Sequence, residues 1–66
     1  HWEADTLVDT MRFVFFADKS DETHNNYGKF VNQAIASVKS FAKAVNWKED
    51  SDDIIVRVHQ HIMLKV

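Results

Sequence analysis

Apolar residues fall into three stretches of the chain, and two polar stretches separate them. The polar stretches cover residues 18–26 and 46–53, and both are rich in the Asp, Asn and Ser side chains that form turns and helix caps. The chain has a single glycine and no proline, so little in it interrupts long helices. The pattern predicts an all-α domain, a small three-helix bundle.

The first apolar stretch predicts a helix from about Thr6 to Ala17. Thr6 is followed three residues later by Asp9, which is a variant of the capping-box signature at a helix start. Apolar residues crowd the second half of this stretch and cover more than one helical stripe. We therefore expect this helix to make contacts on more than one side.

The middle stretch has the clearest helical spacing in the chain. Asn25 or Asn26 is the expected cap at its start, and Asn46 is the expected left-handed residue at its end. The apolar side chains recur every three or four positions and predict one buried face, formed by Phe30, Val31, Ala34, Ile35, Val38, Phe41, Ala42 and Val45.

The last stretch, residues 54–66, fits a strand and a helix almost equally well. Its β-branched residues favour a strand, but thirteen residues exceed the usual strand length of about five or six. Ser51 as a cap, with Asp52 and Asp53 in the first turn, favours a helix. We predict a helix whose apolar face includes Ile55, Val56, Val58, Ile62 and Met63. The alternative is an α+β fold with a C-terminal strand 54–66.

The chain has 66 residues, enough for one small domain that spans residues 1–66. It begins with His1 and not with Met, which indicates a fragment or module of a longer protein. Apolar residues make up 45% of the chain, and a domain this small has difficulty covering so many of them. We therefore expect that dimerisation completes the bundle.

The expected function is protein–protein interaction or self-association, in which apolar helix faces are buried in a shared core. The expected partner is a second copy of the chain, as a homodimer, or a helix of another protein. The interface residues predicted on the first and third helices are Met11, Phe13, Phe16, Ile55, Ile62 and Met63.

A small helical nucleic-acid-binding module is the alternative function. Lys39 and Lys43 stand one helical turn apart and, with Arg57, could contact phosphates. The net charge of −2 disfavours this alternative, because nucleic-acid-binding domains usually carry a basic surface.

Other kinds of chemistry have weaker support in the sequence. His59 and His61 would share one side of a strand and could then bind a metal ion, whereas on a helix they diverge. The chain has no cysteine, and we expect neither a cofactor nor enzyme activity, because it leaves little room for a substrate cavity. No apolar run approaches the roughly 18 residues of a membrane span, so we expect a soluble, intracellular protein.

Overall fold

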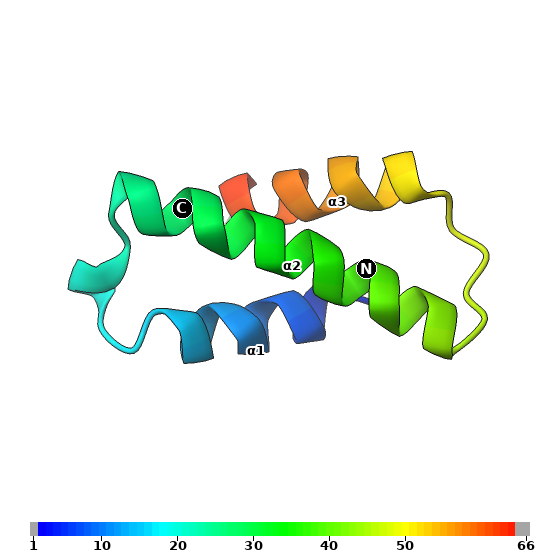
Figure 1. Cartoon of the computed structure of the whole chain (residues 1–66), viewed down its shortest axis with the longest axis horizontal. Helices are drawn as coiled ribbons and strands as arrows, with labels where there is room; N and C mark the ends of the chain where they lie inside the picture. The colour runs from blue at the N-terminus through cyan, green and yellow to red at the C-terminus, as the bar shows by residue number, and fades with distance from the viewer. Residues whose placement is uncertain (1, 65–66) are drawn as a thin grey trace.

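The computed structural model describes residues 2–64 and places them in three α-helices (Figure 1). Helix α1 spans Asp5–Phe15, α2 spans His24–Ala44 and α3 spans Ser51–Leu64, with a 3-10 turn, η1, at Lys19–Asp21. The predicted all-α three-helix bundle is confirmed. The alternative of a C-terminal strand is wrong for residues 54–64, which are helical, and Lys65 and Val66 lie outside the described residues.

The start of α1 differs from the prediction. The helix begins at Asp5, its N-cap is Ala4, and no side chain caps it, so the predicted capping box at Thr6 and Asp9 is wrong. A carboxylate oxygen of Asp5 accepts a hydrogen bond from the backbone N–H of Trp2 at 3.3 Å. The helix therefore begins one residue earlier than expected, and this hydrogen bond connects Trp2 to its first residue.

The two polar stretches form caps, although not always at the predicted residue. Thr23, and not Asn25 or Asn26, caps α2, because its hydroxyl accepts from the N–H of Asn26. Asn46 has a φ of 53°, which confirms the predicted left-handed residue after α2. Ser51 is the first residue of α3 and not its cap, since the Asp50 carboxylate accepts from the N–H of Asp52.

The core is shared by all three helices, and α2 supplies its centre. The predicted face of α2 is buried at Phe30, Val31, Ala34, Val38 and Ala42. Two residues that were predicted on this face, Phe41 and Val45, are exposed. Phe41 lies in the last turn of α2, and Val45 is the C-cap residue that follows the helix.

Helix α3 buries a narrower stripe than the sequence pattern predicts. Ile54, Val58 and Ile62, four residues apart, are at most 2% exposed. Val56 and Met63, which were predicted on the buried face, are 52% and 55% exposed. The bundle contacts one row of α3 side chains, and the remaining apolar residues of this helix lie beside or outside that row.

Aromatic rings gather at both ends of the bundle. At one end Phe16 and Phe30 meet edge to face with centroids 5.2 Å apart, and the Tyr27 ring stacks on Phe16. At the other end the rings of Trp2 and Trp47 lie 6.0 Å apart. Trp2 is buried in the core, and Trp47 is partly buried against it.

Candidate functional site

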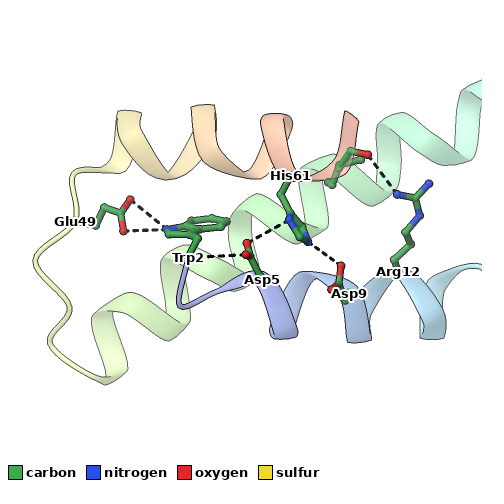
Figure 2. A network of polar contacts seen from close by, with 7 residues as sticks. Trp2, Asp5, Asp9, Arg12, Glu49 and His61 are labelled. Carbon is green, nitrogen blue, oxygen red and sulfur yellow. Dashed lines mark hydrogen bonds and ion pairs between the residues drawn. The ribbon is translucent and has the colours of Figure 1, made fainter. Parts of the chain in front are cut away.

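Helix α1 faces α3 with polar side chains. Asp5, Asp9 and Arg12 are spaced by four and three residues, so they lie on one flank of the helix. All three contact α3: the two aspartates contact His61, and Arg12 reaches the backbone at Ile62. We call this row of contacts the α1–α3 seam; Figure 2 shows it in profile.

His61 stands at the centre of the seam, with its ring between two carboxylates (Figure 2). Its Nε2 lies 2.7 Å from Oδ1 of Asp9, and its Nδ1 lies 3.2 Å from Oδ1 of Asp5. The His61 side chain is 15% exposed, while those of Asp5 and Asp9 are 26% and 40% exposed. Water therefore screens these contacts less than it would at an open surface.

Arg12 joins α1 to both other helices. Its Nη2 pairs with Oε2 of Glu22 at 2.9 Å, its Nη1 donates to the Ile62 carbonyl at 3.4 Å, and it lies over the Tyr27 ring. The Tyr27 hydroxyl donates to the same carbonyl. The hydrogen bond to Glu22 is the main reason that the pKa of Arg12 is raised above its usual value, although partial burial opposes it.

Glu49 lies in the loop before α3 and makes contacts with residues of two other parts of the chain. The indole N–H of Trp2 donates to both oxygens of this carboxylate, and Arg57 of α3 pairs with it at 2.9 Å. The Glu49 side chain is only 14% exposed, and it needs these donors because a buried carboxylate without partners is costly. The loop before α3 is thereby fixed to the segment before α1.

The polar side chains of the seam are paired with groups of the same chain. Among residues 2–64, no buried side-chain nitrogen or oxygen lacks a hydrogen-bond partner. Within the same range, no three His, Cys, Asp or Glu side chains form a group that could hold a metal ion. His59 and His61 diverge on α3: His61 faces α1, while His59 is exposed on the other side, where it lines an outer groove.

That groove runs between α2 and α3 on the outside of the bundle. It has a volume of about 490 Å³, and Gly28 and Val31 of α2 line it together with His59 and Met63 of α3. A Cβ built on Gly28 would meet nothing within 4 Å. The only glycine of the chain therefore lies against open space and is not required by helix packing.

The six residues predicted as an interface divide into three pairs. One pair is in the core of the chain, one pair is half-buried at its edge, and one pair is exposed to solvent. The core pair is enclosed by the chain's own helices, so only the other two pairs reach the surface. In that order the pairs are Phe16 and Ile62, Met11 and Ile55, and Phe13 and Met63.

The three residues of the predicted nucleic-acid surface do not converge. Lys39 and Lys43 lie one turn apart on α2, half-buried and exposed respectively. Arg57 lies one turn before His61, on the side of α3 that faces α1, and it pairs with Glu49. Its charge is therefore already matched by a carboxylate of the same chain.

Sequence reasoning missed the seam, because it assigned Asp9 to a helix cap and considered His61 as a possible metal ligand beside His59. The spacing of Asp5, Asp9 and Arg12 was the available signal, since it predicts one polar flank on an otherwise apolar helix. Its partner on α3 lies 52 residues away from Asp9, and no local pattern connects the two.

None of the helices within the described range is long and apolar enough to cross a membrane.

Comparisons with known proteins give a family for the chain. No curated protein and no solved structure matches the chain. A family model described as "Protein of unknown function (DUF3083)" matches residues 1–64, and the chain therefore belongs to that family.

Proposed function

We propose that the chain is a protein–protein association module, and that a second copy docks on the outer face of α1 around Phe13 and Val14. The observation that carries the proposal is the exposure of these neighbours, 82% for Phe13 and 73% for Val14. Contiguous exposed apolar surface is a feature of protein association sites, and the partly exposed Met11–Phe15 segment supplies such surface on α1.

Burying the Phe13 and Val14 side chains in a dimer would contribute a sizeable free energy of association. Burying a phenylalanine side chain that was exposed contributes roughly 1.5–3 kcal/mol, and aromatic residues often dominate interface energies. Beside Val14, a hollow of about 220 Å³ between α1 and α2 is lined by Met11, Phe15 and Gln33. A partner side chain could enter this hollow while Phe13 is covered, so the docking face offers a ridge and an adjacent recess.

A second copy is the favoured occupant because the same face then serves both partners. In a two-fold dimer the same surface patch of each copy lies in the interface, so one copy's Phe13 can meet the other copy's hollow in both directions. Two-fold dimers are the commonest symmetric assemblies. Phe13 of one copy and the hollow beside Val14 of the other would then meet on both sides of the axis. Met63 and Val56 of α3 are also exposed but belong to a separate stripe, so they are not part of this face.

The alternative nucleic-acid function has no comparable support. It depends on three cations of which one, Arg57, is engaged with Glu49, and the other two stand on a different helix. The association proposal depends on side chains that no other part of the described chain covers.

The test is the molar mass in solution, measured by light scattering after size exclusion over a hundredfold range of concentration. We expect the parent chain to approach the mass of a dimer and Phe13→Asp to remain a monomer at every concentration. Ala36→Asp is the matched control, because it adds the same charge at an exposed apolar position on α2. A parent chain that stays monomeric, or a Phe13→Asp variant that associates like the parent, overturns the proposal.

A further inference from the structure

We propose that the outward face of α2 binds a short acidic helix of a partner protein through Lys29, Lys39 and Lys43. This inference goes beyond the proposed association and uses a surface on a different helix. The chain would then have one apolar face for a second copy and one cationic face for an acidic partner.

The charges of the chain are divided unevenly along the sequence. Residues 23–48 contain four lysines and no Asp or Glu, so their formal charge is +4 with histidine counted as neutral. The whole chain carries −2, and the other residues together therefore carry −6. Helix α2 contains three of the four lysines, whereas α1 and α3 both contain aspartates.

The three lysines of α2 lie on one side of the helix. At about 100° per residue they fall within an arc of about 80°, and they span about 21 Å along the axis. Lys29 and Lys43 are exposed and Lys39 is half-buried, while Asn32 and Ala36 lie between them and are exposed. We call these five residues the lysine face.

The charge of the lysine face is not matched by carboxylates of the described residues. The ion pairs within residues 2–64 involve Arg12, Arg57 and His61, and none involves a lysine of this face. Lys39 and Lys43 stand one turn apart, a spacing at which like charges repel. An anionic group placed between them would reduce this repulsion, and that gain would add to the direct attraction.

Acidic residues beyond both ends of α2 limit the length of the anion that fits. Asp18 and Asp21 belong to the turn that precedes the helix. Asp50, Asp52 and Asp53 lie at the start of α3, at the same end of the bundle as the last turn of α2 (Figure 1). A nucleic-acid strand that continued past α2 would therefore meet carboxylates at either end, and these would repel its phosphates.

A short acidic helix fits the lysine face better. Helix α2 has 21 residues and is about 31 Å long, so a partner helix of about 20 residues would match its length. Carboxylates repeated every three or four residues on such a helix would form one acidic stripe opposite the lysines. Complementary charges of this kind favour encounter and fix the register of the two partners.

The test is fluorescence anisotropy at low salt, with a fluorescein-labelled peptide of glutamate and alanine, about 20 residues long, as the probe. We expect saturable binding that weakens as salt is added, because salt screens exposed charges. A variant with both Lys39→Gln and Lys43→Gln should bind the peptide roughly fivefold more weakly, as the loss of two ion pairs implies. Lys19→Gln is the matched control: it removes an exposed lysine outside α2 and should bind like the parent.

Three outcomes overturn the proposal: no binding of the peptide at low salt, a double variant that binds like the parent, and equal binding of a peptide with glutamine in place of glutamate. A single-stranded DNA oligonucleotide of the same charge is measured in parallel. Tighter binding of the DNA than of the peptide also overturns the proposal, because it would identify a nucleic acid as the partner. Phe13→Asp should still bind the peptide, so a failure of the proposed association is distinguishable from a failure of this inference.

Discussion

The indole N–H of Trp2 lies 3.3 and 3.1 Å from the two carboxylate oxygens of Glu49, a residue 47 positions later in the chain. Trp2 is 8% exposed, and its ring packs beside that of Trp47. The start of the chain is therefore anchored both by a buried ring and by a charge-assisted hydrogen bond. The two contributions can be separated by mutation.

Trp2→Phe should keep most of the ring packing and lose the hydrogen bond to Glu49. We expect the free energy of unfolding to fall by about 1.5–3 kcal/mol, the usual contribution of a hydrogen bond to a charged group. Urea unfolding monitored by circular dichroism measures the loss. Trp47→Phe removes the other indole and leaves the Glu49 bond in place, so equal losses in the two variants would contradict this assignment.

Arg12→Met should destabilise the bundle by about 1–2 kcal/mol, because it removes the donors that reach Glu22 and the Ile62 carbonyl while keeping an apolar stem. The pKa of Arg12 is raised in the folded chain, so its stabilisation is present below the usual arginine value and is lost only above it. The difference between parent and variant should therefore be constant from about pH 6 to about pH 9.

Unfolding curves of both chains across that range provide the measurement for Arg12. Arg12→Lys is the matched variant: it keeps the charge but lacks the fork that reaches two acceptors at once. We expect it to recover only part of the lost stability. Full recovery by lysine would show that charge alone, and not the pair of hydrogen bonds, accounts for the role of Arg12.

Gly28→Ala should stabilise the chain. Gly28 lies inside α2, where glycine costs roughly 0.5–1 kcal/mol relative to alanine, and an added Cβ would meet nothing within 4 Å. A rise in the thermal midpoint, measured by circular dichroism, is the expected result. Ala36→Gly, at an exposed position of the same helix, should lower the midpoint by a similar amount. A lower midpoint for Gly28→Ala would mean that this helix needs the glycine for a reason other than space.

The helices could be predicted because their signals are local. The three-and-four spacing from Phe30 to Ala42 describes one face of one helix, and that face is buried. The length of the run that ends the chain, together with the acidic residues before it, favoured a helix over a strand for the same kind of reason. The face of α3 could not be predicted, because its apolar residues surround much of the helix. Which row enters the core depends on the positions of α1 and α2, and those positions selected Ile54, Val58 and Ile62.

The seam required information that one stretch of sequence does not contain. Asp9 and His61 each have an ordinary local interpretation, a cap residue and a solvated histidine, and neither interpretation is unreasonable by itself. Their contact arises only when α1 lies against α3. Phe13 is the opposite case: the excess of apolar residues on the first helix did predict exposed apolar surface, and Phe13 carries much of it.

The polar contacts of the seam also determine how far α1 can slide along its own axis. An apolar flank tolerates a shift of one turn, because one aliphatic side chain can replace another with little loss. A shift that moved each residue of α1 to the place of the residue four positions before it would put Phe13 where Asp9 now meets His61. The same shift would separate Arg12 from Glu22 and from the Ile62 carbonyl. The bundle therefore has one axial register for its shortest α-helix, set by hydrogen-bond partners that only one alignment can satisfy.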